Sequence, residues 1–351
     1  MTTTSAAATD GNGSVIHDIG YKPYSGERLG RAHIVRALYL FSLRAAFGYG
    51  RGARARIIPA LCFVAILLPA AISIYKIAST GGEPVVSYAN YANDTSLLMI
   101  VFIAVAAPEL VSRDLRHHTL PLYFSRPLRR TDYPLAKLLA LAAAIFLLEA
   151  VPLLLMYLGS IASDTSGSAV WHQTRELVPG LLVALAYGLA FAPLALLVAS
   201  TTGRRAMATG AIAILFLATT AISHVFESVG THDGPPPTSQ GAPVTPGQGS
   251  GPDAGAAVPD NSGGSGPPDG SGGSSFEEIR IHRTYDSIAR YGGLIDPLRL
   301  VEGSRIWALH ATDGNMPDPG SAGPVYVLEL ILLTGLTTGG LFLRYRRVGV
   351  A

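Results

Sequence analysis

The stretch Leu135–Leu158 reads LAKLLALAAAIFLLEAVPLLLMYL, and its only charged residues are Lys137 and Glu149. A helix needs roughly 20 mainly apolar residues to cross the hydrocarbon core of a bilayer. Five further stretches have the same character: Ile57–Tyr75, Ser96–Ser112, Leu177–Ser200, Met207–Phe226 and Val325–Leu343. The sequence therefore predicts an all-α integral membrane protein with six transmembrane helices.

The composition of the whole chain agrees with this fold class. Of its 351 residues, 49% are hydrophobic and only 14% are charged, whereas soluble domains carry about 25% charged residues. The formal net charge of +2 gives no indication of a nucleic-acid partner. Membrane lipid is the expected surrounding because of the apolar composition. The single cysteine, Cys62, excludes an intrachain disulfide and a cysteine-based metal cluster.

Basic residues gather on alternate connections between the predicted spans. The clusters precede span one, join spans two and three, join spans four and five, and follow span six, as at Arg54-Ala-Arg56, Arg129-Arg130, Arg204-Arg205 and Arg346-Arg347. The short connections on the other side contain only Lys76 and Arg175 as basic residues. By the positive-inside rule, this pattern predicts a multi-pass protein of the cell membrane with both termini in the cytoplasm.

A helix is also predicted before the first span, over Leu29–Phe47. Ile34, Leu38, Phe41 and Ala45 recur at helical spacing there, with arginines on the far side. This pattern favours an amphipathic helix in the cytoplasmic interface. A soluble helix packed on the inner face of the bundle is the alternative.

These features divide the chain into successive regions. Residues 230–275 are rich in Gly, Pro and Ser and cannot bury enough apolar surface to offset chain entropy, so a flexible external linker is expected. The predicted regions are a disordered cytoplasmic tail (1–28), an interfacial helix and connector (29–56), spans one to five (57–229) with a patterned segment at 108–137, the linker (230–275), an external segment with short helices (276–324), and the sixth span with a basic tail (325–351).

The patterned segment, between spans two and three, reads PELVSRDLRHHTLPLYFSRPLRRTDYPLAK over residues 108–137. Glu109 and Arg113 are four residues apart, so they share a helix face, and Arg113 is the expected partner of this carboxylate. A short amphipathic helix is expected at residues 119–124, and Pro127 ends it. The segment is thus a short cytoplasmic helix flanked by charged residues.

This segment resembles the type-2 ATP-binding-cassette (ABC) export permease family, and six spans with both termini inside also fit that family. The charged, Thr-Leu and proline positions that carry the resemblance are Glu109, Arg113-Asp114, Thr119-Leu120, Pro127 with Arg129 or Arg130, and Lys137. Arg116 belongs to the same charged end of the segment and is a further candidate for contact with the ATPase. Two positions differ, because His118 and Ala136 stand where the family has glycine.

The resemblance implies a non-enzymatic permease subunit. Residues 115–122 would be the coupling helix that docks on a separate ATPase subunit, and a second permease subunit would complete a homodimer or heterodimer. The chain contains no G-x-x-x-x-G-K-[ST] motif, so no cofactor is expected in it, and ATP and Mg²⁺ would bind the partner. An ordinary basic loop is the alternative for the segment itself.

Three residues within the spans are further candidates. Glu149 lies near the middle of span three, where a carboxylate is costly unless it is protonated or paired. It either lines a substrate path or forms a polar contact between helices. Gly335 and Gly339 form a G-x-x-x-G motif that lets two helices approach closely, within the subunit or between two subunits.

Two other functions are weighed against the export permease. A secondary transporter driven by an ion gradient could use Glu149 as a proton carrier, but no inverted repeat is evident between the two halves. A membrane-embedded hydrolase ranks last, because no pair of metal-ligand histidines at helical spacing occurs and no metal site is expected. The substrate stays open.

Overall fold

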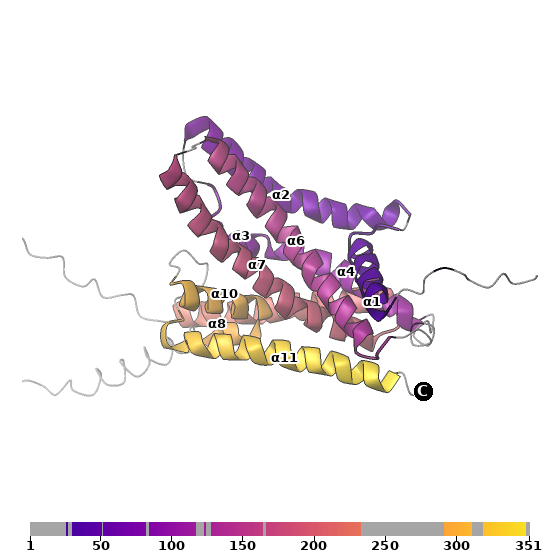
Figure 1. Cartoon of the computed structure of the whole chain (residues 1–351). Helices are drawn as coiled ribbons and strands as arrows, with labels where there is room; N and C mark the ends of the chain where they lie inside the picture. The colour runs from indigo at the N-terminus through magenta and orange to yellow at the C-terminus, as the bar shows by residue number, and fades with distance from the viewer. Residues whose placement is uncertain are drawn as a thin grey trace, which may run out of the picture.

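The structure is a computed structural model that describes residues 26, 30–50, 52–81, 84–116, 123, 128–163, 166–232, 291–310 and 319–348, and these residues form helices and connections but no strand. The elements, shown in Figure 1, are α1 (Arg31–Ala46), α2 (Arg54–Thr80), α3 (Tyr91–Asp94), α4 (Ser96–Arg116), α6 (Asp132–Ser163), α7 (Gly167–Thr201), α8 (Arg205–His232), η1 (Gly292–Ile295), α10 (Pro297–Leu309), η2 (Gly320–Ala322) and α11 (Gly323–Val348). The predicted N-terminal tail and linker, and the helix expected at residues 119–124, lie almost entirely outside the described residues.

The six predicted spans are confirmed: α2, α4, α6, α7, α8 and α11 are long and apolar enough to cross a membrane. The helices extend beyond the apolar stretches, most clearly in α7, which begins ten residues before Leu177. Its first turns carry polar residues such as His172 and Glu176, and Ser166 caps it by accepting a hydrogen bond from the Ala169 amide at 3.4 Å. Hydropathy marks the part of a helix that suits lipid, whereas capping sets where the helix begins.

Helices α6 and α7 form the centre of the bundle and bury much of their length. At Gly188 of α7, an added Cβ atom would lie 2.8 Å from the carbonyl oxygen of Ala142 on α6, so glycine is required for this close approach. The large apolar side chains of α2, α8 and α11 are in part exposed, among them Leu61, Ile214 and Leu336. These exposed faces suit contact with lipid.

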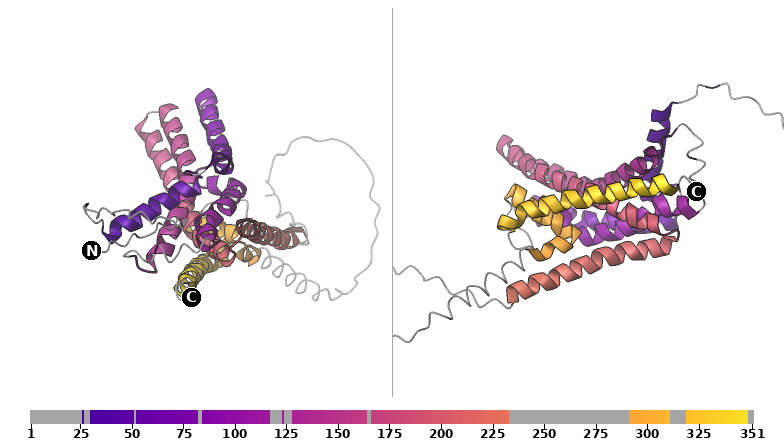
Figure 2. Two further views of the ribbon diagram at one scale, coloured as in Figure 1. Left: turned by 90° about the vertical axis from the view of Figure 1, so that its right-hand side faces the viewer. Right: turned by 90° about the horizontal axis from the view of Figure 1, so that it is seen from below.

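The bundle has two distinct ends. At one end α4 and α11 finish while α6 and α8 begin, and we call this the basic end; the opposite end is the far end (Figure 1). Helices α2, α6 and α7 diverge from α8, α10 and α11 towards the far end (Figure 1). Helix α1 lies across the basic end (Figure 2) and packs on α6 and α4 with Leu38 and Ala46 buried.

The segment between α2 and α4 enters the bundle instead of staying at its surface. The Tyr91 side chain of α3 is fully buried, and its hydroxyl donates a hydrogen bond to the carbonyl of Ile66, in the middle of α2. An added Cβ atom at Gly180 would lie 2.6 Å from the carbonyl oxygen of Tyr88, so this segment also rests directly on α7. The sequence predicts a short external connection here and does not indicate that Tyr91 is buried so deeply.

Candidate functional site

The two flanks of the 108–137 segment meet at the basic end. Asp114, near the end of α4, accepts a hydrogen bond from the hydroxyl of Tyr133 at 2.6 Å. The ammonium of Lys137, one turn further along α6, lies 3.0 Å from the same carboxylate oxygen and over the Tyr133 ring. We call Asp114, Tyr133 and Lys137 the flank cluster. Because the Lys137 side chain is only 4% exposed, this ion pair is shielded from water and salt.

Tyr133 extends this cluster in two further directions. Its ring lies 5.4 Å from the ring of Tyr123, which belongs to the segment itself, and 5.3 Å from the ring of Tyr345 near the end of α11. Aromatic rings at this separation attract each other beyond the apolar area they bury. Tyr123, in the middle of the segment, therefore contacts the start of α6 at Tyr133, and Tyr133 in turn contacts α11.

Helix α1 is attached to the beginning of α6 by a two-pronged ion pair. The Arg31 guanidinium donates to the two carboxylate oxygens of Asp132 at 2.7 and 2.5 Å. The Arg129 amide also donates to Asp132, at 2.9 Å, which stabilises the start of α6. Asp132 is buried whereas Arg31 is partly exposed, so the geometry of the pair, more than its burial, makes it specific.

A second ion pair joins α4 to α8. The carboxylate of Glu109 is buried and pairs with the guanidinium of Arg205, the first residue of α8. Sequence reasoning proposed Arg113, four residues further along the same helix, as the partner. The Arg113 side chain lies outside the described residues, and Arg205 supplies a contact that local spacing could not reveal.

The other residues predicted for this site are only partly described. Arg116 is exposed at the end of α4, and Arg129 and Arg130 are exposed just before α6. Thr119, Leu120 and Pro127 lie outside the described residues, so the coupling helix itself stays a prediction. The structure thus brings together Asp114 and Lys137, whereas Arg116, Arg129 and Arg130 are exposed at the surface.

Glu149 is fully buried in the middle of α6. The hydroxyl of Thr95, immediately before α4, lies 3.0 and 3.2 Å from its two carboxylate oxygens and 2.8 Å from the carbonyl oxygen of Tyr91. A threonine hydroxyl has a single proton, so it can donate to one of these acceptors at a time. When Thr95 donates to Tyr91, its contact with Glu149 needs a proton on the carboxyl. Glu149 therefore makes a polar contact between α6 and the start of α4.

A buried charged group on α10 was not found from the sequence. Arg305 donates to Glu302 at 2.8 and 3.0 Å, and both side chains are almost fully buried. Asp296 caps α10 by accepting from the Leu298 amide at 3.1 Å, and burial raises the pKa of its carboxyl. Arg299 lies 3.4 Å from the His224 ring of α8. In the sequence, the three-residue spacing of Glu302 and Arg305 could have indicated this ion pair.

The predicted glycine motif has no packing role in the described part of this chain. Around Gly335 and Gly339 of α11, no described atom lies within 4 Å of the position of an added Cβ atom. Close contacts instead occur at other glycines, among them Gly188 of α7 against α6. Contact of the motif with a second subunit stays a prediction.

The described residues contain no group of three or more His, Cys, Asp or Glu side chains that could hold a metal ion.

Comparisons with known proteins agree with the resemblance seen in the sequence. A search of curated proteins found no match. The family described as ABC-2 family transporter protein matches residues 63–242, slightly more than half of the 351 residues. The match includes the second to fifth spans and most of the first. The chain therefore belongs to the ABC-2 family of transporter membrane proteins.

Proposed function

We propose that this protein is the membrane-spanning permease subunit of an ATP-driven exporter, whose ATP is hydrolysed by a separate ATP-binding-cassette subunit. Permeases of the family generally pair with such ATPases and typically lack catalytic activity themselves, which supports the proposal. The observation that carries it is the flank cluster. Asp114 and Lys137 lie at opposite ends of the segment that would contact the ATPase, and they pair with each other.

The flank cluster gives the segment a mechanical connection to the spans. A displacement of the segment would move the end of α4 and the start of α6 together, because the Asp114–Lys137 pair joins them. The Arg31–Asp132 pair would carry the motion to α1, and the Glu109–Arg205 pair would carry it to α8. Closely packed interiors have low compressibility, so such contacts transmit displacement well.

The proposal includes the orientation and assembly of the protein. The basic end would face the cytoplasm, with both termini on that side, in agreement with the distribution of arginines. Two permease subunits, identical or different, would bind two ATPases, and ATP and Mg²⁺ would bind only those partners. The exposed Gly335 and Gly339 of α11 are available for contact between the permeases.

Copurification from native membranes tests this function. We expect the wild-type chain to retain an ATP-binding-cassette ATPase and the variant Thr119→Pro to lose it, because proline disrupts a helix at the proposed docking point. Thr165→Pro, between α6 and α7 in the sequence, is the matched control and should retain the ATPase. Equal ATPase recovery from both variants would contradict docking at this segment.

A secondary transporter is the second candidate, favoured by the buried carboxyl of Glu149. In that case transport would continue in ATP-depleted vesicles and would respond to a proton gradient. Its rate would then fall in the variant Glu149→Gln, which cannot exchange a proton. An ATP-driven exporter would lose transport on ATP depletion instead.

A further inference from the structure

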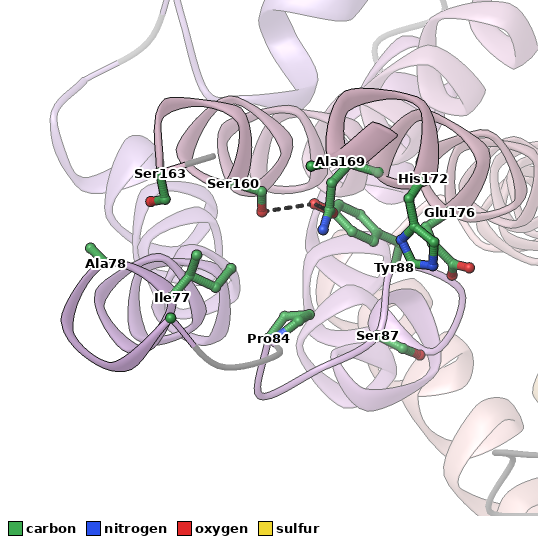
Figure 3. A pocket seen from close by; sticks show the side chains of 12 residues that line it. Ile77, Ala78, Pro84, Ser87, Tyr88, Ser160, Ser163, Ala169, His172 and Glu176 are labelled. Atoms are coloured by element: carbon green, nitrogen blue, oxygen red, sulfur yellow. Dashed lines mark hydrogen bonds between the residues drawn. The ribbon is translucent and has the colours of Figure 1, made fainter. Parts of the chain in front are cut away.

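A cavity of about 890 Å³ opens at the far end of the bundle, away from the flank cluster. Figure 3 shows the side chains that line it. Its walls are the last turns of α2, residues 84–88, the last turns of α6 and the first turns of α7. We call it the far-end cavity, and its defining residues are Ile77, Pro84, Tyr88, Ser160, His172 and Glu176. The volume falls within the range of about 300–1,000 Å³ that small-molecule sites occupy.

Tyr88 gives the far-end cavity a fixed wall. Its hydroxyl donates to the side-chain oxygen of Gln173 on α7 at 2.9 Å and lies 3.2 Å from the hydroxyl of Ser160 on α6. The close contact between Gly180 and the Tyr88 carbonyl holds the backbone of this residue against α7. The side chain is 2% exposed, so it bridges the two helices without free rotation. The cavity is therefore preformed.

The described lining contains one carboxylate and no lysine or arginine. Among the described residues that line the cavity, Glu176 is the acidic one. His172 lies one turn before Glu176 on α7, and Figure 3 shows the two side chains together beside Tyr88. Burial raises the pKa of Tyr88, and the nearby charge of Glu176 adds to the rise. The cavity thus combines a carboxylate with neutral hydroxyls.

Apolar surface completes the lining. Ile77 and Ala78 come from α2, and Pro84 comes from the segment that follows it. An anion would meet the carboxylate of Glu176 and no basic side chain among the described lining residues, and this repulsion costs affinity. A molecule with a positive charge and an apolar body satisfies both the carboxylate and the apolar wall.

We propose that the far-end cavity binds an amphipathic organic cation, with the positive charge at Glu176 and the apolar body against Ile77 and Pro84. The role of this molecule as transported cargo rests on the proposed function, whereas its binding does not. On the proposed orientation the cavity lies at the outer side of the membrane, so it is a site that cargo occupies before release.

Binding of tetraphenylphosphonium to the purified full chain in lipid nanodiscs tests the proposal, with tetraphenylborate as the anion of matched shape. Equilibrium dialysis against empty nanodiscs separates binding to protein from partition into lipid. We expect saturable binding of the cation and weaker binding of the anion. We expect Glu176→Gln to weaken cation binding by at least about threefold, the effect of losing one exposed charge contact.

Two further variants sharpen the test. Glu329→Gln removes a carboxylate in the first turns of α11 and should leave binding unchanged. Gly180→Ala should weaken binding as well, because the added Cβ atom displaces Tyr88. Equal binding of cation and anion, or equal affinities of the Glu176→Gln and Glu329→Gln variants, would overturn the proposal. The assay contains no ATPase, so its result is independent of whether the chain is driven by ATP.

Discussion

The ammonium of Lys137 at the start of α6 lies 3.0 Å from the carboxylate of Asp114 at the end of α4. These two residues flank the one segment of the chain that resembles a coupling element of ABC exporters. Their ion pair holds the two ends of the segment together, and we call this paired region its base. On the proposed function, contacts of the same end with α1, α8 and α11 would carry motion from this base to the remaining helices.

Removal of one partner of the flank pair is expected to destabilise the protein more than removal of both. Lys137→Met leaves the Asp114 carboxylate shielded without its cation, and a loss of roughly 3 kcal/mol is expected, as for other buried pairs. The double variant Asp114→Asn/Lys137→Met should recover a substantial part of this loss. Thermal unfolding of the purified variants measures both effects, with the exposed Arg116→Gln as control. Additive losses would show that the two side chains do not interact.

Asp132 should matter more for stability than its partner Arg31. Asp132→Ala removes the ion pair to α1 and the contact with the Arg129 amide, for a loss of about 2 kcal/mol. Arg31→Ala removes only the ion pair, which is partly exposed, and should cost less than Asp132→Ala. The two variants can be compared by thermal unfolding in detergent. A larger loss for Arg31→Ala would contradict the assigned contacts.

Glu149 is expected to tolerate an uncharged polar replacement. In Glu149→Gln the side-chain amide can donate to the Thr95 hydroxyl while Thr95 donates to the Tyr91 carbonyl, so stability should stay within about 1 kcal/mol of the wild type. Glu149→Ala leaves a cavity and should cost about 2–3 kcal/mol. Thermal unfolding distinguishes these outcomes. An equal loss in both variants would contradict the hydrogen-bond assignment.

Asp296 makes the stability of the α10 region dependent on pH. Burial raises the pKa of its carboxyl in the folded protein, so the folded state holds this proton more tightly than the unfolded state. The associated stability is therefore complete below the unfolded pKa of about 3.9 and is lost as pH rises through the folded pKa. Asp296→Asn keeps a capping side chain but carries no charge, so its stability should depend less on pH.

Unfolding midpoints of wild type and Asp296→Asn between pH 4 and pH 7 test this expectation. The midpoint of the variant relative to the wild type should increase with pH. Asp296→Ala, which also loses the cap, should be less stable than Asp296→Asn by about 1 kcal/mol at every pH. A constant difference between wild type and Asp296→Asn would show that the carboxyl titrates normally.

The spans could be predicted because lipid imposes a simple requirement on sequence. A stretch such as Leu135–Leu158 must be apolar over its whole length, whatever its neighbours are. Contacts between distant helices follow no such requirement. Glu109 pairs with Arg205 because the fold brings the ends of α4 and α8 together, whereas spacing along the chain pointed only to Arg113.

The far end was harder to predict than the basic end. Tyr88 and Tyr91 lie in a short connection whose length suggested exposure, yet Gly180 allows that connection to enter the bundle. Glu302 and Arg305 were expected to lie in an external segment, where charges are ordinarily solvated. They are buried because each satisfies the other at close range, and pairing of this kind appears only in the folded chain.

The most direct test of the account is photo-crosslinking in native membranes from two positions at opposite ends of the bundle. A photoreactive amino acid in place of Thr119 reports on the proposed docking segment, and one in place of the exposed Trp171 of α7 is the control. The account predicts an adduct between position 119 and an ATP-binding-cassette ATPase, and none from position 171. An ATPase adduct from position 171 alone, or none from position 119, would contradict the claim that this segment receives the force of ATP hydrolysis.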